Sequence, residues 1–281
     1  MTSFEDVRKK WDDNWSALKT WRVKTEEAIS HYNGDGWVDV VDGALVPITR
    51  DGASLSSVPF IQVQARTVRA QLLKPRPIGE PKPANSSPRS ILSAKAASQL
   101  VHQMAGKENV GYWQALGRAI LWSILSGVGI TKTYWNPATT RMPSIDDCRV
   151  RAISPFEIAF DPTAQNVHDC LWIIQRSVLS PEIVFSNWGV KLEPDAATTN
   201  RQIVRSALSR ERDKAGVMVW EWWRRPCKTP ENPEDQGEFI IFAGEKTLYS
   251  GPMPTERYPF VVWPLEESTD FIIGDSFIWQ A

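Results

Sequence analysis

The sequence predicts an α+β protein in which N-terminal helices and a proline-rich strap pack on an antiparallel or mixed β-sheet. Apolar residues recur at intervals of three and four through most of the first 126 residues, the spacing of amphipathic helices. Later segments alternate instead: between Cys148 and Ala152, apolar residues alternate with two arginines, as in a half-buried strand. Five prolines lie between residues 75 and 88, a density that no helix tolerates.

A long helix is predicted over residues 4–33. Ser3 can cap its start, and Asn33-Gly34 can end it. Its apolar stripe is mainly aromatic and includes Phe4, Val7, Trp11, Trp15, Leu18 and Tyr32. We expect this stripe to pack on the rest of the protein; a ligand surface or a neighbouring subunit is the alternative.

Residues 36–57 predict a loose loop or a small hairpin, because they combine glycines, alternating valines and Pro47. Pro59 then begins a second helix, with Ile61, Ala65, Val68 and Leu72 on one side. The strap, residues 75–88, must run extended as a linker or along a surface. A ligand for a proline-binding domain is the less favoured interpretation of this strap.

Two further helices are expected, over residues 88–106 and 112–126. Pro88 can occupy the first turn of the former, and Gly127 and Gly129 end the latter before a strand through residue 135. The chain therefore divides into a helical N-terminal region, residues 1–106, which includes the strap, and a β-rich region, residues 107–281.

The segment from Cys148 to Ser177 organises the second region. It contains two strand-like runs, the second being Leu171–Ile174, around a short insertion in which Ser154-Pro155 and Asp161-Pro162 force turns. Ser180-Pro181-Glu182 predicts a helix that ends near Trp188-Gly189. Strand-like stretches follow at residues 217–223, 239–242 and 260–263, and we expect one sheet with helices on one side.

Composition restricts the function only broadly. The 281 residues carry a net charge of −1, so no whole-chain electrostatic argument favours nucleic acid or a membrane. The polar stretch 191–214 is locally basic; a solvated helix or loop is favoured there over a nucleic-acid contact. No apolar run reaches the roughly 20 residues needed to span a bilayer. Three widely spaced cysteines predict free thiols and a reducing compartment such as the cytoplasm.

A search for reactive motifs gives no convincing match. Gly244-Glu245-Lys246-Thr247 lacks the glycine spacing of a phosphate-binding loop and is expected to lie between strands. Gly127-Val128-Gly129 is only a pair of glycines at a helix-to-strand junction. The three histidines, His31, His102 and His168, are far apart, and none has a second ligand at metal-binding spacing.

Acidic residues were considered as ligands for Mg²⁺, which nuclease chemistry requires. The candidates are Asp146, Asp147, Asp161 and Asp169, which are near one another in sequence, and the Glu80-Pro81-Lys82 triplet. Turn formation explains the aspartates better, and the triplet falls in the strap. We therefore expect no catalytic, cofactor-binding or metal-binding residues.

Several segments, taken in order, resemble portal proteins of tailed bacteriophages, particularly the short-tailed type. The segment SPFEIAFDPTAQNVHDCLWIIQRSVLSPEIVFSNWG, residues 154–189, is the closest match. The other segments that carry the resemblance are HYNGDGW (31–37), VPFIQVQARTVRAQLLKPRPIGEPKP (58–83), GVGITKTYWNP (127–137), EWWRRP (221–226) and RYPFVVWPLEESTDFIIGDSFIWQ (257–280).

The resemblance implies a structural role and no enzymatic activity. Portal proteins form rings, usually of twelve subunits, at one vertex of the capsid, and DNA passes through the central channel without sequence readout. The resemblance implies contacts with the terminase large subunit, the capsid and tail or adaptor proteins, and a location in the virion, with assembly in the host cytoplasm. The chain corresponds to the N-terminal wing and ends where the stem would begin, so it is either a fragment or a shortened relative.

Two other classes stay open. A carbohydrate-binding module would need exposed, coplanar tryptophan rings in a shallow groove. An Mg²⁺-dependent nuclease would need Asp146, Asp161 and Asp169 to converge around one cavity.

Overall fold

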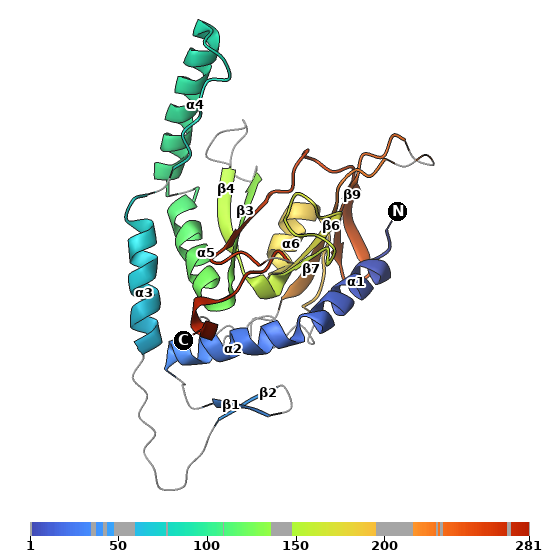
Figure 1. Cartoon of the computed structure of the whole chain (residues 1–281). Helices are drawn as coiled ribbons and strands as arrows, with labels where there is room; N and C mark the ends of the chain where they lie inside the picture. Colours follow the sequence, from blue (N-terminus) through green and yellow to red (C-terminus); the bar gives the residue numbers. More distant parts are fainter. Residues whose placement is uncertain are drawn as a thin grey trace.

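A computed structural model describes residues 2–34, 38–41, 44–47, 60–76, 78–108, 110–135, 148–194, 216–228, 230, 233–268 and 271–280. The fold is α+β, with helices packed on antiparallel sheets (Figure 1). The helices are α1 (Phe4–Ala17), α2 (Lys19–Asn33), α3 (Phe60–Leu73), α4 (Pro88–Gly106), α5 (Tyr112–Ser126) and α6 (Pro181–Trp188), with 3-10 turns η3 (Pro155–Glu157) and η5 (Phe277–Gln280). The strands are β1 (Val38–Val41), β2 (Ala44–Pro47), β3 (Val128–Trp135), β4 (Cys148–Ile153), β5 (Ile158–Phe160), β6 (Trp172–Leu179), β7 (Val217–Arg224), β8 (Glu238–Ala243), β9 (Lys246–Gly251) and β10 (Phe260–Pro264).

The N-terminal helix is interrupted at Leu18, so the prediction of one helix over residues 4–33 is wrong in this detail. Ser3 caps α1 in a capping box with Asp6, and Gly34 ends α2 in the left-handed conformation, as predicted. The two helices bury their apolar faces against different partners. α1 packs on β-strands, while α2 packs on α3 and α5. The break lets each helix meet its own partner.

The strap lies beside α4 and not on a sheet, which corrects the prediction that it packs on the β-region (Figure 1). Residues 78–87 have no regular secondary structure and run along α4. Ser87 caps α4, and Pro88 occupies its first turn, as predicted. α4 projects from the rest of the molecule, and among its described residues only Ala105 is fully buried.

The β-strands form two main sheets and one hairpin, all antiparallel. A three-stranded sheet has the order β10-β3-β4, and a five-stranded sheet has the order β5-β6-β7-β8-β9. β1 and β2 pair as the small hairpin predicted within residues 36–57. One sheet was expected to contain both strand-like runs of the segment from Cys148 to Ser177, but β4 and β6 belong to different sheets. The Ser154-Pro155 turn therefore carries the chain from one sheet to the other.

The two sheets pack face to face, with a helix on each outer side. Ile130 and Phe260 of the three-stranded sheet share a core with Ile173 and Trp223 of the five-stranded sheet. α5 covers the outer face of the former, and α1 covers the outer face of the latter. The expectation of helices on one side only is therefore wrong. Each sheet buries both faces, and each outer face needs its own helix.

Close approach of α5 to β3 explains the two glycines of residues 127–129. A Cβ atom on Gly129 would overlap the backbone carbonyl oxygen of Ala119 in α5. Gly127 ends α5 with φ of +81°, a conformation that favours glycine. Both glycines therefore have a structural role, in agreement with the interpretation that they do not form a ligand-binding motif.

The β8–β9 hairpin corrects one strand assignment. Gly244 and Glu245 form its turn, with Gly244 at φ of +58°, and Lys246 and Thr247 begin β9. The sequence Gly244–Thr247 was expected to lie between strands, and β9 was missed because its residues are mostly polar and exposed. A free edge strand carries little apolar signal.

Candidate assembly interface

The acidic residues predicted as turn formers are turn formers wherever the structure describes them. Asp161 accepts hydrogen bonds from the backbone and side chain of Thr163, at 3.0 and 2.7 Å, and from the backbone N–H of Leu171, at 3.1 Å. Burial raises the pKa of Asp161, but these hydrogen bonds outweigh it, so the pKa lies below its usual value. Asp169 accepts a hydrogen bond from the side chain of Asn166. Asp146 and Asp147 lie outside the described residues.

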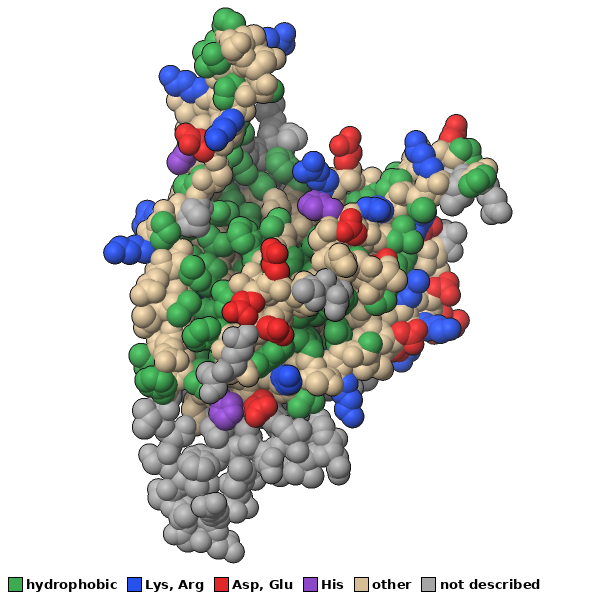
Figure 2. All heavy atoms as spheres, in the orientation of Figure 1, with side chains coloured by type: hydrophobic (Ala, Val, Ile, Leu, Met, Phe, Trp, Pro, Cys, Tyr) green, Lys and Arg blue, Asp and Glu red, His purple; other side chains and the backbone are tan. Residues whose placement is uncertain are grey.

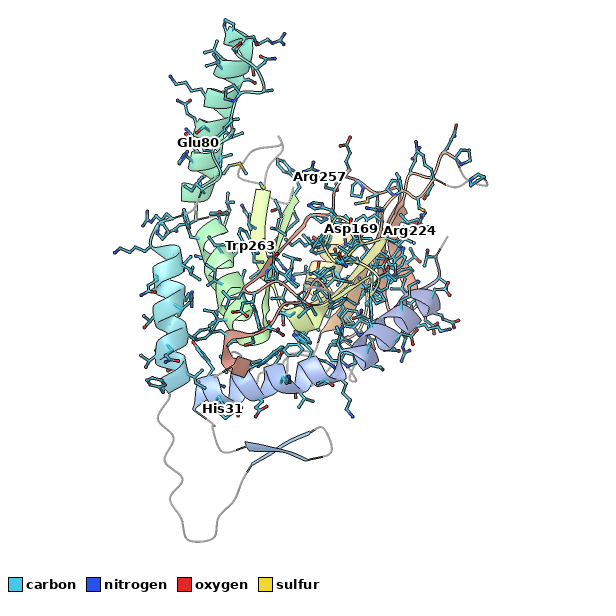
Figure 3. The ribbon with its side chains drawn as sticks, in the orientation of Figure 1. His31, Glu80, Asp169, Arg224, Arg257 and Trp263 are labelled. Carbon is cyan, nitrogen blue, oxygen red and sulfur yellow. The ribbon has the colours of Figure 1, made fainter. Side chains whose placement is uncertain are left out.

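The other candidates for chemistry are dispersed. His31 lies at the end of α2, Glu80 beside α4 and Asp169 near β6 (Figure 3). His31 is 3.8 Å from Glu27 on the same helix, while His102 and His168 are exposed. In the part of the chain that the structure describes, no three His, Cys, Asp or Glu side chains are grouped to hold a metal ion. That part also contains no helix long and apolar enough to cross a membrane.

A buried ion pair joins the two sheets, and it was not predicted from the sequence. Lys132 of β3 donates to Glu221 of β7 at 2.5 Å and to Gln175 of β6 at 2.8 Å. Trp223 donates its indole N–H to the same Glu221 oxygen at 3.0 Å. Burial lowers the pKa of Lys132, and Glu221 opposes that shift. Because the partners of Lys132 belong to strands of the other sheet, Lys132 fixes the position of the two sheets relative to each other.

A second buried charge lies on the opposite face of the five-stranded sheet. The guanidinium carbon of Arg176 lies 4.2 Å from the ring centroid of Trp11 and 5.0 Å from that of Trp15. Arg22 lies on Trp15 as well, at 4.0 Å. Burial lowers the pKa of Arg176 to about 10. The contacts of Arg176 fasten α1 to β6, and Arg22 links α2 to α1 across the break at Leu18.

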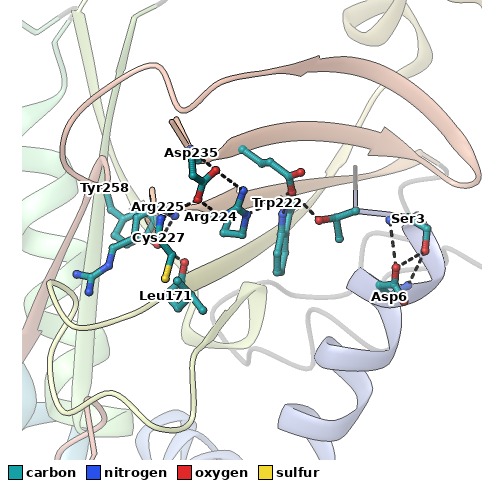
Figure 4. A network of polar contacts seen from close by, with 12 residues as sticks. Ser3, Asp6, Leu171, Trp222, Arg224, Arg225, Cys227, Asp235 and Tyr258 are labelled. Carbon is teal, nitrogen blue, oxygen red and sulfur yellow. Dashed lines mark hydrogen bonds and ion pairs between the residues drawn. The ribbon is translucent and has the colours of Figure 1, made fainter. Parts of the chain in front are cut away.

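A third polar network ties the N-terminus to β7 and β8 (Figure 4). Asp235 accepts two hydrogen bonds from Arg224, at 2.6 and 2.8 Å, and a third from the backbone N–H of Cys227. The Arg224 bonds are the main reason why the pKa of Asp235 is strongly lowered. Glu238 accepts from Thr2 at 2.5 Å and from Trp222 at 3.3 Å. The network therefore connects residue 2 with β7 and β8.

The three cysteines are free thiols, as predicted. Cys170 is buried, and that burial raises its pKa to about 12, so it is a poor nucleophile at neutral pH. Cys148 is half-buried, and burial raises its pKa too.

Most tryptophans serve the core. Six of them are buried: Trp11, Trp122, Trp172, Trp220, Trp222 and Trp223. Trp135 and Trp263 are the described tryptophans with strongly exposed rings. Trp263 pairs with Gly129 on β3, six residues from Trp135, which corresponds to about 20 Å along the strand. They do not form the contiguous platform that a carbohydrate-binding module requires.

Several large exposed apolar side chains lie on α3 and α4, the second of which projects from the rest of the molecule. We define the arm as residues 60–107, which comprise α3, the strap and α4. Its exposed apolar residues are Phe60, Val63, Leu72, Ile91, Leu92 and Leu100. An exposed apolar surface of this kind is typical of a protein–protein contact. The arm is therefore the candidate assembly interface.

Counting charges by segment would have identified the arm from the sequence. The arm contains eight Lys and Arg residues and one acidic residue, so its net charge is 8 − 1 = +7. The whole chain has a net charge of −1, so the remainder carries −8. The near-zero net charge of the whole chain does not reveal that the arm is basic and the remainder acidic.

A comparison with protein-family models and with curated proteins finds no match for this chain. Its function is therefore argued from the geometry described above and from the resemblance of its segments.

Proposed function

We propose that this chain is a structural subunit of a phage portal ring, at the capsid vertex through which DNA is packaged and ejected, and that it is not an enzyme. The observation that carries the proposal is a difference between the buried charged side chains and the exposed apolar side chains. The charged side chains buried in the described part of the chain, Lys132, Asp161, Arg176 and Asp235, all contact neighbours that fix strands, turns or layers. Six large exposed apolar side chains lie on the arm instead, outside any core cluster of the described residues.

The segments that resemble portal proteins also support the proposal because they coincide with structural units. Residues 127–137 include the step from α5 into β3, and residues 154–189 run from η3 through β6 to α6. Residues 257–280 contain β10, which pairs with β3. The order of the resembling segments thus follows the order of packed elements.

A portal role would give the chain the partners of that family. The proposed partners are further copies of this chain in a ring, with twelve subunits expected, together with the terminase large subunit, the capsid and tail or adaptor proteins. Double-stranded DNA would pass through the channel with contacts to its backbone only. The location would be the portal vertex of the virion, with assembly in the host cytoplasm.

Mass measurement tests the proposal. We would measure the mass of the 281-residue chain, and of the chain lengthened by a portal stem, by mass photometry and native mass spectrometry. A single closed species with a defined subunit number is expected for the lengthened chain. A monomer at every concentration in both forms would contradict the proposal. Binding of Mg²⁺ with cleavage of DNA would favour the nuclease alternative.

A further inference from the structure

The outer face of α4 carries an apolar stripe flanked by positive charge. Leu92, Ala96 and Leu100 are spaced at i, i+4 and i+8, so they lie on one face of the helix. Leu92 exposes 67% of its surface. Arg89 and Lys95 lie three residues before and after Leu92, at the borders of this stripe. The stripe could bury itself only against another apolar surface that is acidic at its edge.

The positive charge of the arm lies mainly on exposed side chains. None of Arg66, Arg69, Lys74, Arg76, Lys82, Arg89 and Lys95 forms an ion pair with another residue that the structure describes. α4 projects away from the region of the C-terminus (Figure 1). Among the described residues, the acidic side chains near the C-terminus of the same copy therefore lie away from α4.

The body of the same chain offers a surface of the opposite kind. Residues 263–277 contain four acidic and no basic residues, a net charge of 0 − 4 = −4. Glu266 and Asp275 form an isolated backbone β-bridge, and Glu267 is exposed beside them. Trp263 and Phe277, which are also exposed, lie before and after these acids in the sequence. We call the described residues 263–268 and 271–277 the acidic face.

Figure 2 shows acidic side chains near the centre of one side of the molecule, close to a broad hydrophobic area. Apolar contact provides most of the free energy of a protein interface, while charge complementarity selects the partner and its orientation. A DNA backbone would match the positive charge of the arm but not the exposed Leu92 and Leu100. An acidic surface bordered by aromatic rings matches both.

We propose that the arm of one copy docks on the acidic face of a second copy, with the α4 stripe against Trp263 and Phe277. The inference deepens the portal proposal and rests on it, since it names the contact between neighbouring subunits. Arm and acidic face are different surfaces, so the contact is heterologous. Contacts of this type close into a ring when the rotation between copies allows it, and otherwise extend into open chains.

A charge swap between two variants tests this contact. The arm-reversed variant is Arg89→Glu/Lys95→Glu, and the face-reversed variant is Glu267→Lys/Asp275→Lys. Each variant alone opposes like charges at the contact, so its self-association, measured by sedimentation of the full chain, should weaken by about tenfold or more. An equimolar mixture should recover association, because each reversed surface then meets its opposite. Lys9→Glu/Lys19→Glu, which reverses two exposed charges outside the arm, should have no effect.

The outcomes separate this inference from the portal proposal. Rings that form equally well after arm reversal would overturn the inference and leave the portal proposal intact. Open chains that are sensitive to arm reversal would support the inference and contradict a ring. A wild-type chain that stays monomeric at the highest attainable concentration, or a mixture that fails to associate, would overturn the inference. Unchanged self-association together with lost binding to a 30-base-pair duplex would assign the arm to DNA instead.

Discussion

The body and the arm use charged side chains in opposite ways. In the body, Lys132 and Arg176 are buried and contact residues from other elements, which fixes the layers relative to one another. In the arm, the basic side chains are mostly exposed, and they accompany exposed apolar residues such as Leu92. The same residue types therefore stabilise the fold in one region and remain available for a partner in the other.

This comparison argues against a reactive centre in the described part of the body. A catalytic group needs a perturbed pKa together with access to substrate. Lys132 and Cys170 have perturbed pKa values, but both are buried among structural partners. The body is thus built for rigidity, and substitutions there should change stability most.

The largest effect is expected from breaking the ion pair between the sheets. Lys132→Met would leave Glu221 charged and without its cation in the interior, at a cost of about 3–5 kcal/mol in the free energy of unfolding. Urea denaturation at pH 7 measures this loss. Lys132→Met/Glu221→Gln removes both charges and should recover most of it. A loss below about 1 kcal/mol for the single variant would show that the pair is not needed.

A smaller loss is expected where α5 approaches β3. Gly129→Ala places a methyl group against the carbonyl oxygen of Ala119, so the helix must move outward, at a cost of about 1–3 kcal/mol. Gly106→Ala in the arm is the matched control, because a Cβ atom there meets open space. The control should change the free energy of unfolding by no more than about 0.5 kcal/mol. Equal effects at both positions would contradict the contrast between body and arm.

The Arg224–Asp235 pair should make stability depend on pH. Its hydrogen bonds hold the pKa of Asp235 below the unfolded value of about 3.9, so the stabilisation is complete above that value and is lost as the pH falls toward the folded pKa. Asp235→Asn should cost about 1–2 kcal/mol at pH 7 and progressively less below pH 4. Urea midpoints at pH 7, 4 and 3 measure the difference. Glu256→Gln, at an exposed position, serves as the control; a constant Asp235→Asn effect from pH 7 to 3 would contradict this assignment.

Local signals in the sequence predicted the element ends well. Ser3, Ser180-Pro181 and Gly189 act where the sequence placed them, because a cap satisfies backbone groups only a few residues away. The break at Leu18 was not predictable in this way, since it depends on which elements α1 and α2 each pack against. β9 was missed because polar residues at a sheet edge do not alternate clearly.

Pairing between residues and strands that are far apart in the chain could not be predicted from the sequence. Lys132 and Glu221 are 89 residues apart, and nothing near either one indicates that they form an ion pair between the two sheets. The assignment of β4 and β6 to separate sheets likewise depends on which strands pair across the chain. The role of Asp161 as a turn residue, and not as a metal ligand, could be predicted because Asp161-Pro162 is a local turn signal. The candidate interface could be predicted only in part. Its positive charge can be counted in the sequence, whereas the exposure of its apolar side chains cannot.

The smallest effect on folding, and the clearest contrast, is expected at Leu92. Leu92→Gln keeps a good helix former on an exposed face, so in dilute solution the free energy of unfolding should change by no more than about 0.5 kcal/mol. Leu125→Gln, at a fully buried site in α5, should lose several kcal/mol by the same urea measurement. At high concentration Leu92→Gln should weaken self-association, because it removes a strongly exposed side chain from the stripe that docks on a second copy. If Leu92→Gln instead destabilises the isolated chain as much as Leu125→Gln does, then α4 is covered within its own copy and the arm has no free face to offer.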